Sequence, residues 1–139
     1  MKRATGFALL FPLLLLAGCF PVYKTLQPSA SVRVLDDSGR PVTQAEVTMI
    51  ASAYPYGLEK QRFIRATDNS GAASFPSISE WRVESIMLHG SETYFWNWCV
   101  RKDGYTTYAT DFSSEAEFQQ HLRLQMQKGV SGPCPQDRR

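Results

Sequence analysis

Apolar and polar residues alternate along several short stretches of this chain, and the alternation predicts β-strands. Two stretches, residues 45–51 and 93–101, show it most clearly. Their apolar side chains stand at every second position: Ala45, Val47, Met49 and Ala51 in the first, and Tyr94, Trp96, Trp98 and Val100 in the second. Successive side chains of a strand point to opposite faces, so each set lies on one face. Both stretches are expected to be half-buried strands.

Clusters of turn-forming residues separate these stretches from one another. Residues 36–39 are Asp-Asp-Ser-Gly, residues 68–71 are Asp-Asn-Ser-Gly, and residues 102–104 are Lys-Asp-Gly. Such clusters favour tight turns. The further strand candidates are residues 31–35, 61–67, a short run ending at Phe75, 81–89, 105–110 and 120–127. Seven or eight short strands with turns between them predict an all-β protein, an antiparallel β-sandwich.

The first residues of the chain have the composition of an export signal. Lys2 and Arg3 precede an apolar run over residues 7–17 that only Pro12 interrupts, and small residues stand just before Cys19. This order predicts a signal peptide over residues 1–18, helical before its removal. Two alternatives stay open: an ordinary secretory signal with an incidental cysteine, or an anchor helix that is retained.

The tetrad Leu16-Ala17-Gly18-Cys19 closely resembles the bacterial lipobox. The resemblance implies that the Cys19 sulfur receives diacylglycerol, that cleavage precedes Cys19, and that the new N-terminus is acylated. Several acyl chains together hold a protein on a membrane almost permanently. Aspartate after the cysteine is associated with the inner membrane of proteobacteria, and here the residue is Phe20. We therefore expect a lipid-anchored envelope protein of the outer membrane that faces the periplasm.

Length and composition indicate one globular domain behind this anchor. The chain has 139 residues, of which 43% are hydrophobic and 20% charged. We expect a lipidated tether over residues 19–30, a β-sandwich domain over 31–127 and a C-terminal tail over 128–139. Removal of Lys2 and Arg3 leaves 13 basic residues against 13 acidic ones. A near-neutral chain with scattered basic residues argues against a nucleic-acid partner.

Two cysteines remain when Cys19 is assigned to the lipid. In an exported chain the even pair, Cys99 and Cys134, predicts a disulfide that joins the tail to the sandwich. The alternative is a metal site that uses both thiolates. No histidine or further cysteine stands at ligand spacing beside either residue.

Three groups of residues together resemble carboxypeptidase-regulatory-like domains, which are transthyretin-like (prealbumin-like) β-sandwiches. The first is Asp36-x-x-Gly39-x-Pro41-Val42-x-x-Ala45-x-Val47, the second is Thr67-Asp68-Asn69-Ser70-Gly71 followed by Phe75, and the third is Gly104-Tyr105. Gln44 stands where the family usually has glycine, Ala73 where a larger residue is common, and residues 81–98 form a longer segment than is typical. The resemblance implies a noncatalytic accessory module without active-site residues.

Candidate catalytic and metal-binding groups are few. His89 and His121 are isolated from each other in the sequence, and no Gly-x-Ser-x-Gly motif is present. The turns at Asp36 and Asp68 lack the bidentate glutamate that completes a calcium loop, and turn formation explains their composition. We expect no enzyme, no metal and no cofactor apart from the covalent lipid on Cys19.

Aromatic residues provide the remaining candidate surface. Residues 94–98 place aromatics on both faces of one strand, although a half-buried strand needs only one such face. Phe95, or the loop pair Tyr54 and Tyr56, is therefore a candidate surface for a partner or ligand. The alternative is that Tyr94, Trp96 and Trp98 fill the core while Phe95 packs under a loop.

Three functions follow, in decreasing order of support. The first is a noncatalytic structural or protein-interaction module with an envelope protein as partner. The second is a lipoprotein that binds carbohydrate or another small ligand through its exposed aromatics. The third is an envelope hydrolase or inhibitor.

Overall fold

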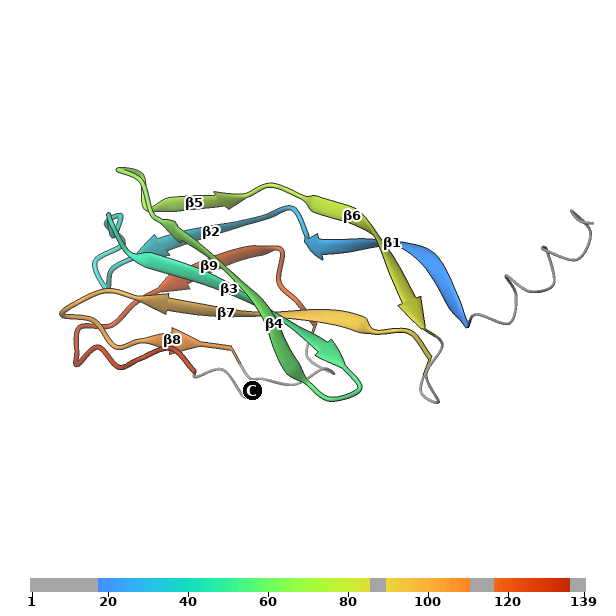
Figure 1. The fold of residues 1–139 in the computed structure, drawn as a ribbon. Helices are drawn as coiled ribbons and strands as arrows, with labels where there is room; N and C mark the ends of the chain where they lie inside the picture. Colours follow the sequence, from blue (N-terminus) through green and yellow to red (C-terminus); the bar gives the residue numbers. More distant parts are fainter. Residues whose placement is uncertain (1–17, 86–89, 111–116, 136–139) are drawn as a thin grey trace, which may run out of the picture. The chain divides into compact units, whose positions relative to one another are not determined.

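Strands account for the regular structure throughout the described part of the chain. The computed structural model describes residues 18–85, 90–110 and 117–135. Within these ranges, all the regular secondary structure is β-strand and none is helix (Figure 1). The expected signal helix over residues 1–18 lies almost wholly outside these residues. The strands are β1 (Cys19–Gln27), β2 (Ala30–Leu35), β3 (Glu46–Tyr54), β4 (Leu58–Ala66), β5 (Ala72–Phe75), β6 (Ile78–Ser85), β7 (Thr93–Arg101), β8 (Tyr108–Ala109) and β9 (His121–Gln125). The all-β prediction is confirmed.

Two compact units divide the described residues. One contains residues 18–24, 81–85 and 90–91, and the other contains residues 25–80, 92–110 and 117–135. Strands β1 and β6 form a two-stranded sheet. The segment predicted to be a tether, residues 19–30, is therefore mostly strand β1. Its two prolines, Pro21 and Pro28, stand inside β1 and just after it, and proline is compatible with an edge strand.

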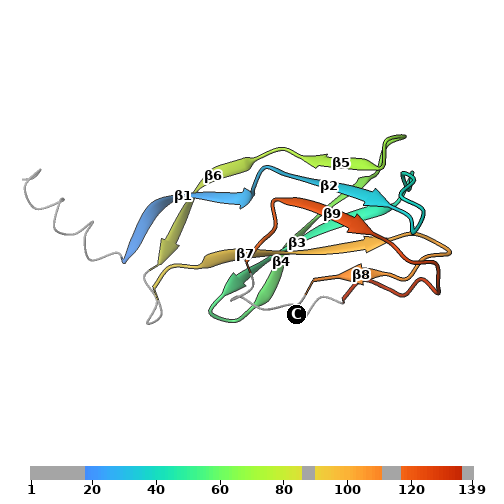
Figure 2. The same cartoon turned by 180° about the vertical axis from the view of Figure 1, so that it is seen from behind.

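The larger unit contains two sheets, with strand orders β5-β2-β9 and β4-β3-β7-β8. Strand β2 pairs antiparallel with β5 but parallel with β9, with Val32 opposite Leu122 (Figure 2). The prediction of purely antiparallel sheets is wrong at this pair. Parallel neighbours need a long connection rather than a hairpin, and residues between β2 and β9 include most of the sandwich. Turn-forming residues indicate only which consecutive strands can form hairpins. They do not predict that β2 pairs with β9.

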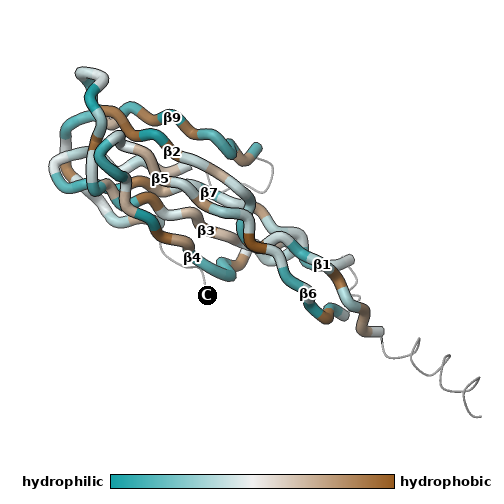
Figure 3. Tube along the Cα trace, turned by 90° about the horizontal axis from the view of Figure 1, so that it is seen from above, coloured by the Kyte–Doolittle hydropathy of each residue, from teal (hydrophilic) through white to brown (hydrophobic). Residues whose placement is uncertain are grey.

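The core lies between the two sheets of the larger unit. Val32 and Val34 of β2 face Val47 of β3, Trp98 of β7 and their neighbours in one buried cluster. The rings of Phe75 and Trp98 lie 5.2 Å apart across the sandwich. Hydrophobic and hydrophilic residues alternate along β9 in Figure 3, as the period of two requires. Two packed sheets around one core fit the predicted β-sandwich class.

Strand β3 is buried on both faces, which corrects the prediction of a half-buried strand. Val47 and Met49 face the core, while Thr48, Ile50 and Ser52 on the other face are each exposed by 2% or less. Cys99 of β7 stands opposite Thr48, on that outer face. Its bonding partner Cys134 belongs to the segment predicted to be a separate tail.

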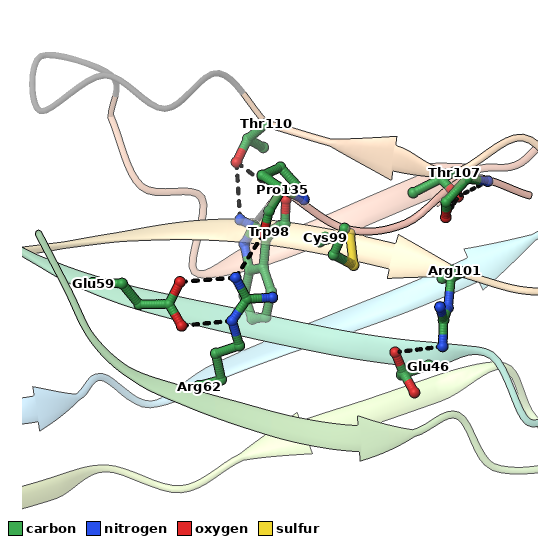
Figure 4. Close-up of a disulfide and its surroundings, with 11 residues drawn as sticks. Glu46, Glu59, Arg62, Trp98, Cys99, Arg101, Thr107, Thr110 and Pro135 are labelled. Atoms are coloured by element: carbon green, nitrogen blue, oxygen red, sulfur yellow. Dashed lines mark hydrogen bonds and ion pairs between the residues drawn. A yellow bond between two sulfur atoms is a disulfide. The ribbon is translucent and has the colours of Figure 1, made fainter. Parts of the chain in front are cut away.

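The described part of that tail is attached to the sheet at three further points. Arg62 of β4 donates a hydrogen bond from Nη2 to the Pro135 carbonyl at 2.6 Å (Figure 4). The Thr107 hydroxyl exchanges hydrogen bonds with the backbone of Gly132. Tyr105 forms a β-bridge with Lys128. The sandwich therefore includes residues 128–135, beyond the predicted limit at residue 127.

Asp36 and Asp68 close the two turns that the sequence predicts. The Asp68 carboxylate accepts hydrogen bonds from the Ser70 amide at 2.8 Å, the Ser70 hydroxyl at 2.7 Å and the Ala72 amide at 3.0 Å. Asp36 accepts hydrogen bonds from the amides of Ser38 and Arg40 in the same way. Gly71 ends the second turn with φ of 73°, a region that favours glycine, and a Cβ there would collide with the Val34 carbonyl oxygen. Both acidic side chains are thus used in turn formation.

Acid is expected to weaken the turn at Asp68. The Ala72 amide, followed by the Ser70 hydroxyl, lowers the pKa of Asp68 from its ordinary value of 3.8. A carboxyl with a lowered pKa in the folded state stabilises the fold above its unfolded pKa, and the contribution is lost as the pH falls through the folded pKa. The denaturant midpoint of Asp68→Ala should therefore lie below that of the parent protein at neutral pH, and the gap should narrow below pH 3.8. Asp103→Ala, which changes an exposed acid of another turn, is the control. A gap that is constant with pH would contradict the assignment.

Candidate functional site

Cys19 is the first residue of β1, exposed, and not bonded to another cysteine. The other two cysteines of the chain are bonded to each other. A thiol that is neither buried nor paired is accessible to a modifying enzyme. The geometry thus leaves one free cysteine, at the position where the sequence predicts lipid attachment.

Cys99 and Cys134 form the predicted disulfide, with their Cα atoms 5.8 Å apart. The pairing uses both sulfurs, so the alternative of a thiolate metal pair is wrong. Cys99 is fully buried on the outer face of β7. The disulfide is therefore a structural link between the sheet and the C-terminal segment.

The predicted aromatic surface is only partly assembled. Tyr54 and Tyr56 at the β3–β4 turn are exposed by 48% and 70%, whereas Phe95 of β7 is half-buried. In the β3–β7 pairing, Tyr54 is opposite Thr93 and Ser52 is opposite Phe95. Tyr54 and Phe95 therefore stand at diagonal positions of one face, a separation that aromatic side chains can span. Tyr56 lies beyond the end of β3, in the turn.

The alternative assignment of the β7 aromatics to the core is correct for Trp98, which is buried in the core, and for Trp96, which packs against it. Trp98 is fully buried, and its indole N–H donates to the Gln119 carbonyl at 2.9 Å. Trp96 is half-buried, and its indole N–H donates to the Leu26 carbonyl at 2.9 Å. Tyr94 is also half-buried. Burial thus increases along β7 toward the middle of the sandwich.

A cavity of about 320 Å³ lies beside these tryptophans. Trp98 and Phe118 stack in its wall with ring centres 5.2 Å apart, and Glu117 is the one acidic residue among its described lining residues. Both tryptophan N–H groups are already bonded to backbone carbonyls. The cavity combines aromatic walls with polar lining side chains, among them Asn97, Thr110 and Glu117.

His121 contacts Ser31 through Nδ1 and Oγ at 3.0 Å. The two residues stand opposite each other in the β2–β9 pair, so the register of the strands explains the contact. His89 lies outside the described residues. Within residues 18–85, 90–110 and 117–135, no three His, Cys, Asp or Glu side chains are grouped so that they could bind a metal ion.

Sequence reasoning missed the most exposed aromatic pair of the described chain. Tyr23 of β1 and Trp81 of β6 are exposed by 60% and 71%, and their rings lie 5.3 Å apart. Val83, two residues after Trp81, is exposed by 74%. The alternation of Trp81 and Val83 with charged neighbours was a usable signal, but alternation alone normally indicates a face turned toward the core.

No family model, curated protein or solved structure matches this chain. Among the described residues, no helix is long and apolar enough to cross a membrane.

Proposed function

We propose that the protein is a lipid-anchored envelope protein whose β-sandwich is a noncatalytic module for interaction with another envelope protein. Residues 1–18 are a signal peptide, and Cys19 carries diacylglycerol on its sulfur and an acyl chain on its amine. The observation that carries the proposal is the exposed, unpaired Cys19 at the end of a tetrad that resembles the lipobox. With several acyl chains the attachment is in effect permanent.

An envelope location is supported by the disulfide. Bonds such as Cys99–Cys134 persist in oxidising compartments, of which the bacterial periplasm is one. Phe20 after the lipidated cysteine favours the outer membrane over the inner membrane, with the sandwich in the periplasm.

The sandwich belongs, in this proposal, to the transthyretin-like carboxypeptidase-regulatory-like class. Support comes from Gln44, which has φ of 55° at the position where that family usually has glycine. This φ lies in the left-handed region of backbone conformation, which glycine adopts most easily. The turns at Asp36 and Asp68, which carry the rest of the resemblance, are each closed by their aspartate side chain.

Cys19→Ser is expected to abolish lipid attachment. Radiolabelled palmitate should enter the parent protein and be absent from the variant, because serine offers no sulfur for thioether formation. Cys134→Ser is the matched control: it also removes one cysteine, and it should keep the label. Equal labelling of the parent protein and Cys19→Ser would contradict the anchor.

A second function, binding of carbohydrate or another small ligand, is favoured by the exposure of Tyr54 and Tyr56. Aromatic rings at a turn offer a large contact area with little entropy to lose. Glycan-array binding that disappears in Tyr54→Ala and Tyr56→Ala would support this role. Copurification of an envelope protein with the acylated chain would instead support the role as a protein-interaction module.

A further inference from the structure

Two pairs of side chains define the two faces of the β1–β6 sheet in the smaller unit. Tyr23 and Trp81 are in ring contact on one face. Lys24 and Glu84 form an ion pair of 2.7 Å, and their side chains are exposed by only 11% and 12%. Because neighbouring residues of a strand point to opposite faces, this ion pair lies on the other face.

The period of two then assigns six residues to the face of Tyr23 and Trp81. We call them the uncharged face: Cys19, Pro21, Tyr23, Trp81, Val83 and Ser85. All six are exposed, and none carries a charged side chain. The charged residues of the same stretches, Lys24, Arg82 and Glu84, alternate with them. An exposed apolar face of this kind marks a contact surface.

We infer that the uncharged face lies against the headgroup region of the membrane, next to the lipid anchor. The inference rests on the proposed function, because Cys19 is both the acylated residue and the first member of this face. The acyl chains would leave the strand on the side where Tyr23 and Trp81 are exposed. The apolar run over residues 7–17 ends two residues before Cys19, so a retained leader would also bring the bilayer to this end of β1.

The residue types on the uncharged face match the chemistry of a lipid surface. Tryptophan and tyrosine concentrate where headgroups meet acyl chains, because their rings are apolar and their N–H and O–H groups remain hydrated. Charged residues would be costly nearer the hydrocarbon, and here they occupy the opposite face.

Distance along the strand favours a flat orientation of β1 on the membrane. Tyr23 lies four residue steps along the strand from Cys19, which corresponds to about 13 Å of extended chain. The headgroup layer on each side of the hydrocarbon is only about 5–8 Å thick. A strand lying along the membrane keeps all six residues at the headgroups. It also keeps the edge of β1 that faces away from β6 out of the hydrocarbon, where its backbone groups could not be hydrated.

Fluorescence of Trp81 tests the inference. The acylated full-length protein is reconstituted into vesicles of phosphatidylethanolamine and phosphatidylglycerol, with or without phosphatidylcholine brominated near the top of its acyl chains. Because the chain has three tryptophans, contact of Trp81 with the brominated lipid should remove about one third of the tryptophan emission. The loss should disappear in Trp81→Phe and persist in Trp96→Phe, the matched control. Trp81 is 71% exposed, so its replacement is not expected to affect folding.

Palmitate incorporation, measured on the same samples, separates this inference from the proposed function. Acylated protein whose emission is unchanged by brominated lipid overturns the membrane contact and leaves the anchor intact. In that case the uncharged face is free in water or covered by a protein. Absence of palmitate overturns both.

Discussion

Replacing both Cys99 and Cys134 with alanine is expected to lower the free energy of unfolding by about 4 kcal/mol. The disulfide joins residues 35 positions apart, and a closed loop of this length removes much of the entropy of the unfolded chain. Since small domains are stable by only about 5–15 kcal/mol, the loss is a large fraction of the total. Urea unfolding of the nonreduced protein, followed by far-ultraviolet circular dichroism, measures the difference.

Reducing agent provides the control for this double variant. It should lower the denaturant midpoint of the parent protein by a similar amount and leave the midpoint of Cys99→Ala/Cys134→Ala unchanged. Equal midpoints of the parent protein and the double variant in nonreducing buffer would contradict the stabilising role. Without the disulfide, only hydrogen bonds such as those of Arg62 and Thr107 would hold the C-terminal segment. We therefore expect this segment to become more sensitive to protease while the sheets stay folded.

Trp98→Ala is expected to destabilise the sandwich by about 3–5 kcal/mol, the usual cost of truncating a large buried aromatic side chain. Trp98 is fully buried between the rings of Phe75 and Phe118, each about 5.2 Å away. Its removal leaves a cavity between the sheets and deprives the Gln119 carbonyl of its donor. Denaturant unfolding followed by circular dichroism reports the change without depending on tryptophan emission.

Two further variants show which part of Trp98 matters. Trp98→Phe keeps an aromatic ring but not the N–H. It should therefore lower the free energy of unfolding by less than Trp98→Ala does. Tyr56→Ala removes an aromatic that is 70% exposed and should change the unfolding free energy by less than about 0.5 kcal/mol. Similar losses for Trp98→Ala and Tyr56→Ala would show that Trp98 is not central to the core.

Several strands and turns could be predicted correctly from short stretches of sequence. The predicted strand over residues 93–101 coincides with β7, and the predicted strand over 31–35 lies within β2. Asp36 and Asp68 close the turns in which they were expected. Once Cys19 was assigned to the lipid, the two remaining cysteines were sufficient to predict the Cys99–Cys134 disulfide. The strands and turns depend on residues that are neighbours in sequence. The disulfide could be predicted because only one partner was left for Cys99.

The candidate surface was harder to predict because exposure is not a local property. Tyr54 and Tyr56 are exposed as expected, but Phe95 is half-buried. Trp81 and Val83, in a strand with a regular apolar face, are exposed instead of packed in a core. Alternation tells which side chains share a face, and the pairing of that strand with others decides whether the face is covered.

Residue order alone was therefore enough to predict the all-β class, the positions of the principal strands and turns, and the cysteine pairing. Its lipobox-like tetrad also defines the anchor that we propose. Three features became visible only in the folded chain: the parallel pairing of β2 with β9, the burial of both faces of β3 and the exposure of the uncharged face. The physical reason is that backbone geometry sets side-chain direction residue by residue, whereas burial and strand partners depend on contacts between segments far apart in the chain.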